Sequence, residues 1–167
     1  LPYGDKNFAK IFDQEDQLNG YAAAYTNWHK GKLRIAFDHM PTDTFVGEIA
    51  VIDWACGQGL ATIFLHEYLE EKGYNCRIKE VILIEPSEKA LDRAKFIIEA
   101  IDSKIKVSTV NKKLDEVIDF DIKLFEKRKT VHLFSNIFDI QGINLKHITE
   151  NLLVNLSKDN YIICVSP

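Results

Sequence analysis

The feature that most constrains the fold is residues 49–62, IAVIDWACGQGLAT. It opens with an apolar run at 49–52, which is typical of a strand buried on both faces. Asp53 closes this strand, small residues follow at 55–59, and an apolar helical pattern begins at Leu60. A strand, a tight glycine turn and a helix make up the opening unit of a nucleotide-binding α/β domain. Glycines are expected in this turn because the backbone must bend sharply and let a ligand approach without an intervening Cβ.

The acid at the end of this strand, Asp53, bears on which ligand the turn would bind. A dinucleotide brings a pyrophosphate, which the free amides of a helix N-terminus attract, and a neighbouring carboxylate would weaken that attraction. A carboxylate suits a ligand that carries an ammonium or sulfonium group. The dinucleotide fingerprint also requires Gly or Ala where this chain has Thr62. A nicotinamide dehydrogenase is therefore the weakest of the interpretations.

The pattern D-x-A-C-G-x-G in this stretch resembles motif I of the class I S-adenosylmethionine-dependent methyltransferases. That family usually has Gly where this chain has Ala55. The resemblance implies that Asp53, Cys56, Gly57 and Gly59 border the methionine part of bound S-adenosylmethionine, with Ala55 a further cofactor-binding position in the same turn. A nucleophilic role for Cys56 is an alternative, because a helix N-terminus lowers thiol pKa values, but a small filler residue is the more ordinary role.

A second acid, Glu85, follows the apolar strand expected at 78–84. An acid at this place in such a domain can bind both ribose hydroxyls of a nucleoside. The run I-E-P-S-x-x-A-L at 84–91 looks like the corresponding motif of the methyltransferase family. The resemblance implies ribose binding by Glu85 and a cofactor contact at Pro86. The competing interpretation is a solvated acid at a strand end.

Two asparagines lie at the ends of later strands. Asn111 follows the strand expected at 105–110, where the family often places an Asp or Asn against the adenine amino group; a turn-forming Asn is an equally good interpretation. Asn136 lies in the strand expected at 131–137, whose end faces the reacting methyl group in class I methyltransferases. The resemblance thus makes both cofactor-binding candidates. Asp139 could act as a general base, although capping a turn is its more ordinary role, and no catalytic base is assigned.

The segment after the fourth strand contains no proline, unlike the N/D-P-P-Y-like sequence of enzymes that methylate exocyclic amines. Methylation of adenine or cytosine amino groups is therefore not supported, and the methyl acceptor stays unknown. The chain also lacks a G-x-x-x-x-G-K-[ST] phosphate loop and the G-x-S-x-G elbow of α/β-hydrolases. Neither C-x-x-C nor H-x-x-x-H spacing is present, so we expect no metal site.

Strands that alternate with helices predict a three-layer α/β/α Rossmann-like parallel sheet with right-handed crossovers. The resemblance covers about residues 49–165 and implies the strand order 3-2-1-4-5. The hairpin of the sixth and seventh strands, which closes the complete fold, is missing. We therefore expect 49–167 to be a methyltransferase-like domain truncated at its C-terminus. Its fifth strand, if it lies at an edge, invites pairing with the rest of a longer chain or with another subunit.

Residues 1–48 are expected to form a helical segment that packs on the α/β domain or caps it. Apolar residues recur between 18 and 40 at intervals of mostly three or four, which is typical of one helical face. Gly31 costs helix stability, by about 1 kcal/mol, so two shorter helices are an alternative. The basic run at 29–34 is usually a solvated face, but it could lie near the substrate if the segment acts as a lid.

The composition fits a single globular domain of 167 residues. A net charge of -4 provides no general attraction to nucleic acid or to membranes. No apolar run reaches the roughly 18 residues of a membrane span. Three cysteines, an odd number, indicate free thiols in a reducing compartment, so we expect a cytoplasmic protein.

The leading hypothesis is an S-adenosylmethionine-dependent methyltransferase with an unidentified acceptor. The alternative is a catalytically silent methyltransferase-like module that serves protein interaction within a larger protein. The missing closing strands and the featureless sequence after the fourth strand favour the alternative, whereas motif I and Glu85 favour the enzyme.

Overall fold

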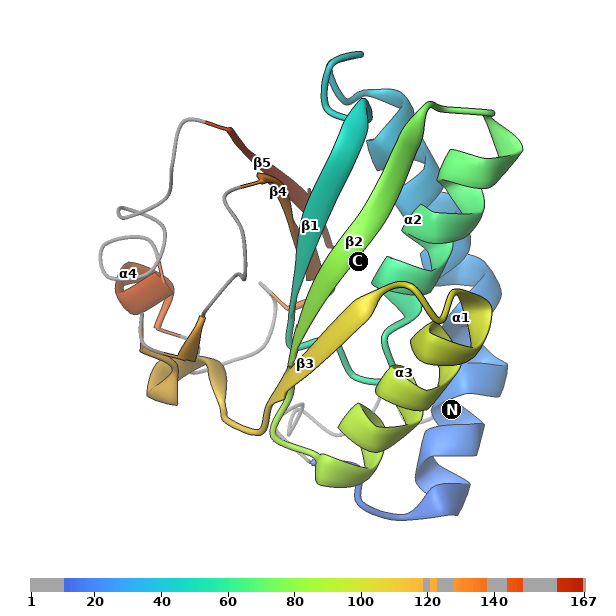
Figure 1. The fold of residues 1–167 in the computed structure, drawn as a ribbon. Helices are drawn as coiled ribbons and strands as arrows, with labels where there is room; N and C mark the ends of the chain where they lie inside the picture. The colour runs from blue at the N-terminus through green and yellow to red at the C-terminus, as the bar shows by residue number, and fades with distance from the viewer. Residues whose placement is uncertain (1–10, 119–120, 123–127, 138–143, 149–158, 167) are drawn as a thin grey trace.

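The computed structural model describes residues 11–118, 121–122, 128–137, 144–148 and 159–166. Within them the chain forms one parallel sheet with helices against it (Figure 1). The elements, in chain order, are α1 (Glu15–Asp38), β1 (Gly47–Trp54), α2 (Leu60–Glu71), β2 (Cys76–Ile84), α3 (Glu88–Ile101), β3 (Lys106–Val110), the 3-10 helix η1 (Leu114–Glu116), β4 (Lys129–Ser135), α4 (Leu145–His147) and β5 (Asn160–Val165).

The five strands are all parallel to their neighbours, in the order β3-β2-β1-β4-β5. This confirms the predicted parallel sheet and its order 3-2-1-4-5. The direction in which strands are added reverses between β1 and β4. Open α/β sheets bind ligands in the crevice outside the carboxyl ends of the strands at such a reversal. The topology therefore directs attention to the ends of β1 and β4.

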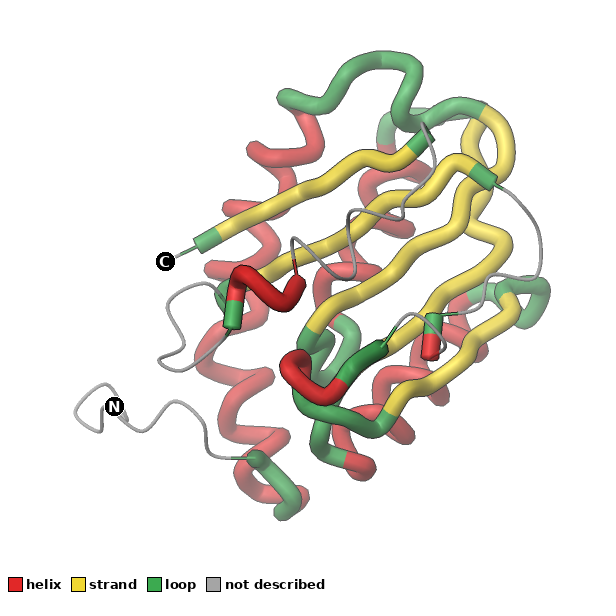
Figure 2. Tube along the Cα trace, turned by 90° about the vertical axis from the view of Figure 1, so that its left-hand side faces the viewer, coloured by secondary structure: helices red, strands yellow, loops and turns green. Residues whose placement is uncertain are grey.

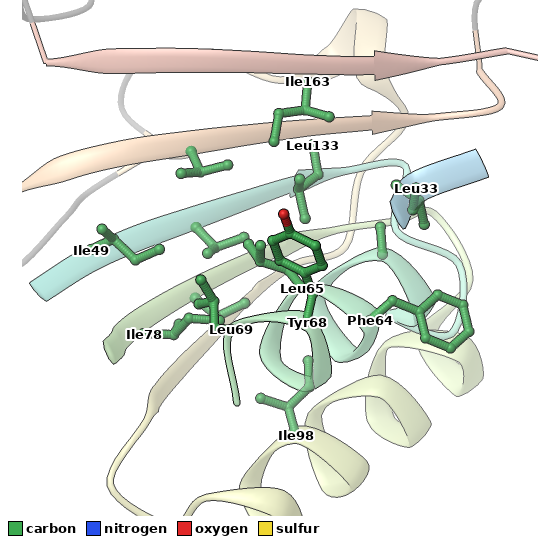
Figure 3. Close-up of a cluster of buried hydrophobic side chains, with 14 of the residues drawn as sticks. Leu33, Ile49, Phe64, Leu65, Tyr68, Leu69, Ile78, Ile98, Leu133 and Ile163 are labelled. Atoms are coloured by element: carbon green, nitrogen blue, oxygen red, sulfur yellow. The ribbon is translucent and has the colours of Figure 1, made fainter. Parts of the chain in front are cut away.

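Helices α1, α2 and α3 cover one face of the sheet, and η1 and α4 lie on the other (Figures 1 and 2). Side chains alternate along β1, so Val51 enters the core under α2 whereas Ile52 joins a second core on the opposite face. Figure 3 shows the first core, where Leu65 and Tyr68 of α2 pack toward Leu133 of β4. Burial on both faces explains why β1 is continuously apolar from residue 49 to residue 52.

Helix α1 is continuous through Gly31, so the structure has one helix where two were an alternative. Buried Leu33 and Phe37 anchor its second half, which offsets the low helix propensity of glycine. Ion pairs from Lys30 to Glu67 (2.6 Å) and from Arg34 to Glu71 join α1 to the next helix, α2. No helix among the described residues has both the length and the apolar character needed to span a membrane.

Several predicted boundaries differ from the observed ones by one or two residues, and β4 differs at both ends. Strand β4 ends at Ser135, not at residue 137, because Asn136 adopts a left-handed conformation with φ of 56°. The short helix expected around residues 114–118 is the 3-10 turn η1. Most of the helix expected at 143–156 lies outside the described residues, which include only α4 from that region.

Candidate functional site

The turn after β1 is built from residues in the left-handed region. Ala55, Gly57 and Gly59 have φ values of 50°, 53° and 75°. Gly59 is required for a second reason, because a Cβ there would lie 2.9 Å from Cβ of Ala94 on α3. Ala55 occupies the position where the methyltransferase family usually has Gly, and the left-handed conformation costs an alanine about 1–2 kcal/mol. Glycine would avoid this cost, so backbone conformation as well as size favours glycine at position 55.

Glu85 binds this turn at the end of β2. Its Oε2 accepts a hydrogen bond from the Gly57 amide (3.1 Å), and its Oε1 accepts one from the Ser87 amide (3.2 Å). Burial raises the pKa of Glu85, while these two amides lower it. The side chain is thus half-buried and held in place. Each carboxylate oxygen has a further lone pair, so Glu85 can still accept hydrogen bonds from two hydroxyls.

Asp53 lies beneath the same turn and is 1% exposed. Its Oδ2 accepts hydrogen bonds from Thr62 Oγ1 (2.7 Å) and from the Thr62 amide (3.3 Å). Its Oδ1 is buried and has no hydrogen-bond partner among the described residues. Burial raises the pKa of Asp53 to about 7; Thr62 lowers it, and the charge of Glu85 adds to the rise. Thr62, at the third position of the glycine pattern, therefore holds the Asp53 carboxyl group in place with two hydrogen bonds.

Cys56 is placed between the two acids and remains a thiol. Burial raises its pKa well above the ordinary value, and the charges of Asp53 and Glu85 raise it further. Its amide donates to the Ile84 carbonyl (2.9 Å), which joins the turn to the end of β2. The structure thus favours the filler role over the nucleophile, since a nucleophilic cysteine needs a lowered pKa.

Asn111 supports the loop after β2. Its Nδ2 donates to the carbonyls of Glu85 (3.0 Å) and Pro86 (2.8 Å). These bonds join the end of β3 to the loop after β2. They bring together three of the predicted cofactor-binding residues, Glu85, Pro86 and Asn111, at the carboxyl edge of the sheet. The Asn111 nitrogen is used for this support, which leaves its oxygen as the atom that could accept a hydrogen bond from an adenine amino group.

Asn136 lies on the other side of β1, immediately after β4. Its amide donates to the Val165 carbonyl (2.8 Å), and its Nδ2 contacts Nδ1 of His29 and donates to Ser135 Oγ (3.0 Å). Its Oδ1 is buried and unpartnered among the described residues. Ala55 and Asn136 are the two non-glycine residues with positive φ in the described chain. Backbone strain of this kind concentrates at functional sites.

His29 of α1 is a site residue that the sequence pattern does not single out. It is 6% exposed, whereas its basic neighbours Lys30 and Arg34 are paired with acids of α2. The available signal was the spacing of Tyr21, Tyr25 and His29 at four-residue intervals, which places them on one face of a helix. Asp139, the other residue considered as a base, lies outside the described residues.

The beginning of α1 is bonded to the turn and to the start of α3. Gln58 Nε2 donates to the Leu18 carbonyl (2.8 Å), and Ser87 Oγ donates to the Phe12 carbonyl (2.8 Å). Arg93 of α3 donates to Gln58 Oε1 (2.9 Å). The beginning of α1 and the residues just before it therefore lie at the carboxyl edge of the sheet, beside the glycine turn.

The fold resembles solved methyltransferase structures. A S-adenosylmethionine-dependent methyltransferase from Leishmania major superposes with a TM-score of 0.55 at 14% identity, over 92% of this chain and 55% of that one. One from Thiobacillus denitrificans, in complex with S-adenosyl-L-homocysteine, gives 0.54 at 17% identity, over 90% and 55%. The chain therefore has the class I methyltransferase fold that its motifs predict. It spans about half the length of these proteins, 55% in both cases.

No family model and no curated protein sequence matches the chain. At identities of 14% and 17%, the structural likeness establishes the fold alone. The function must therefore be argued from the residues at the carboxyl edge.

Proposed function

We propose that the chain is a S-adenosylmethionine-dependent methyltransferase domain. The observation that carries this proposal is a pair of carboxyl groups at the ends of adjacent strands, buried Asp53 and half-buried Glu85, with the Asp53 Oδ1 atom unpartnered among the described residues. An unpartnered buried acceptor is costly unless a ligand donates to it. Such an edge fits a ligand with an ammonium group, a sulfonium group and a ribose diol.

Each part of this ligand has a counterpart in the chain. Asp53 and the turn residues Ala55, Cys56, Gly57 and Gly59 would border the methionine part. Their left-handed backbone and lack of bulky side chains allow close approach. Asp53 and the turn at 55–59 therefore fit the charged, flexible methionine end of the ligand.

The nucleoside part would lie along the ends of β2 and β3. Glu85 retains acceptor capacity for the ribose hydroxyls, and Pro86 and Asn111 are held beside it. Asn136 would border the opposite end of the ligand, at the end of β4. The candidates thus form one row across the carboxyl edge, in the order of the strands.

The same residues disfavour a nicotinamide dinucleotide. Its pyrophosphate would lie beside two carboxyl groups. Repulsion between these like charges would raise the pKa values of the carboxyl groups or lower the affinity for the dinucleotide. Thr62 also lies where the dinucleotide fingerprint requires Gly or Ala, and its amide and hydroxyl both donate to Asp53. The dehydrogenase interpretation therefore has no supporting contact in this site.

Bound S-adenosylmethionine supplies a methyl group activated by the positive charge of sulfur. The chain contributes orientation of that group toward the end of β4 and exclusion of water from it. Asp53 would hold the ammonium as an ion pair, which favours the ionised form of a carboxyl group whose pKa is about 7 in the free protein. The acceptor approaches from the side of Asn136.

Calorimetric titration with S-adenosylmethionine, S-adenosylhomocysteine and NAD tests the proposal. We expect saturable binding of the first two and none of NAD. Glu85→Ala should weaken both by about 10–100-fold, because hydrogen bonds to a charged group contribute about 1.5–3 kcal/mol. Glu88→Ala, which removes an exposed acid three residues away, is the matched control and should leave the affinities unchanged.

The silent-module alternative predicts a different result. If none of the three ligands binds although the protein is folded, the enzyme proposal is wrong and the interaction module becomes the better interpretation. Equal affinities for the Glu85→Ala variant and the parent chain would remove Glu85 from the site while leaving the cofactor class intact.

A further inference from the structure

A second polar cluster lies at the strand reversal, formed by Tyr21 and His29 of α1 and by Ser135 and Asn136 at the end of β4. His29 Nε2 is 3.2 Å from the Tyr21 hydroxyl, and His29 Nδ1 contacts the Asn136 side-chain nitrogen. The cluster joins residues 107 positions apart in the chain. It stands at the β4 side of the crevice in which open α/β sheets bind their ligands.

Three aromatic rings of the same helix lie near the imidazole, and His29 is buried. The ring centroids of Tyr21, Tyr25 and Trp28 lie 5.8, 6.0 and 5.9 Å from that of His29. Burial lowers the pKa of His29 below its usual 6.5, and the nearby charge of Lys32 lowers it further. The imidazole is therefore neutral at pH 7, which is the form that accepts a proton.

The Asn136 amide can be oriented in two ways against the imidazole, and each way pairs a different set of atoms. Here Asn136 Oδ1 has no partner among the described residues. Rotating the Asn136 amide by half a turn would let Oδ1 accept a hydrogen bond from His29 Nδ1–H, leaving Nε2 to accept one from the Tyr21 hydroxyl. The cluster can therefore accommodate the imidazole in either tautomer and in its protonated form.

We propose that Tyr21 and His29 are the proton-accepting pair of the acceptor pocket, so that the methyl acceptor is a molecule whose nucleophilic oxygen or nitrogen carries a proton. The inference rests on the proposed function, because it takes the methyl group to lie between Asn136 and the glycine turn. Tyr21 is the residue that contacts the acceptor, and His29 acts through it.

The transfer balances with these two residues alone. The acceptor heteroatom uses a lone pair to form its bond to the methyl carbon, and the electrons of the carbon–sulfur bond remain on sulfur. The heteroatom's proton passes to the Tyr21 oxygen as the proton of Tyr21 passes to His29 Nε2. The imidazolium then keeps a hydrogen bond to Asn136 Oδ1 until it loses a proton to solvent.

Histidine NMR tests whether this pair faces the reacting group. S-adenosylmethionine and S-adenosylhomocysteine share their ammonium, carboxylate and ribose and differ by the methyl group and the positive charge of sulfur. If His29 faces that charge, its pKa should be lower in the first complex by at least about half a unit, since Coulomb interactions across a few ångströms of protein are of this size or larger. His66 of α2, which lines a separate hollow with Cys76 and Asp102, is the internal control, and its resonances should be the same in both complexes.

The His29 resonance is assigned with His29→Gln, or with Tyr21→Phe if the first variant does not fold. Tyr21→Phe keeps the aromatic packing and should shift the His29 signal alone. The same His29 pKa in both complexes, or a protonated His29 at pH 7 in the S-adenosylmethionine complex, would overturn the proposal and leave the cofactor assignment standing. Failure of both ligands to bind would overturn the proposed function, and this inference with it.

Discussion

The two sides of the carboxyl edge differ in charge and in how they are held. On the β2 side, the acids Asp53 and Glu85 are bonded to residues near them in the chain or in the adjacent turn, and burial raises their pKa values. On the β4 side, the titratable group is His29, held by a residue 107 positions away, and burial lowers its pKa. Both sides therefore favour the neutral form of a buried group in the free protein. They respond to pH in opposite directions.

The largest predicted effect is the pH dependence of stability that Asp53 creates. Its pKa is raised from 3.8 to about 7 in the fold, so the contribution of the protonated form is lost as pH rises toward 7. Between pH 5 and 7 the free energy of unfolding of the parent chain should fall by about 2 kcal/mol relative to Asp53→Asn. Urea unfolding of both chains measures this difference, and parallel stability curves would contradict it.

Cofactor affinity should show the opposite trend on the same side. An ammonium ligand favours ionised Asp53, so binding of S-adenosylhomocysteine should release a proton below pH 7. The affinity should rise about fivefold between pH 6 and 7 and level off above that. Calorimetry at several pH values measures the trend. Asp53→Asn should remove most of the dependence; a dependence that persists in this variant would assign it to another group, Glu85 first.

A smaller effect is expected from the β4 side. Because the pKa of His29 is lowered from 6.5, the neutral form contributes stability above pH 6.5 that is lost as pH falls through the lowered pKa. The parent chain should therefore lose stability relative to His29→Gln in acid, the reverse of the comparison at Asp53. Unfolding at pH 5 and 7.5 tests the sign, and the same difference between the chains at both pH values would contradict it.

The smallest effect concerns backbone strain in the turn shared by both sides. Ala55→Gly should raise the free energy of unfolding by about 0.5 kcal/mol, since it removes a left-handed alanine but adds entropy to the unfolded chain. Ser87→Gly, which removes the N-cap of α3, is a contrasting variant that should destabilise. A loss of stability in Ala55→Gly would show that the strain at residue 55 is already compensated.

The β2 side of the site could be predicted from the sequence because its geometry is local. A buried strand, small turn residues and a helix specify where Asp53 and Gly59 must lie, and Glu85 follows from the next strand. The β4 side could not be predicted in the same way. The contact of His29 with Asn136 depends on how α1 packs across the sheet edge, and neither residue has a sequence motif that names the other.

Some local details also escaped the sequence pattern. The left-handed conformation of Asn136 shortens β4, although the strand's apolar pattern continues to Ile137. Thr62 departs from a glycine pattern, and nothing in that pattern indicates that its hydroxyl donates to Asp53. Side-chain hydrogen bonds of this kind depend on three-dimensional placement, whereas apolar periodicity reports only which face is buried.

The bonds from Gln58 and Ser87 to the backbone before and within the beginning of α1 have a thermodynamic consequence. A ligand that ordered the glycine turn would also stabilise the hydrogen bonds that connect the turn to the beginning of α1. Linkage is reciprocal. A protein that bound the beginning of α1 and pulled it away would lower the affinity of the site for its ligand, and the ligand would lower the affinity of that protein by the same factor. A partner bound at the beginning of α1 and a ligand bound at the glycine turn would therefore be coupled through the hydrogen bonds of Gln58 and Ser87.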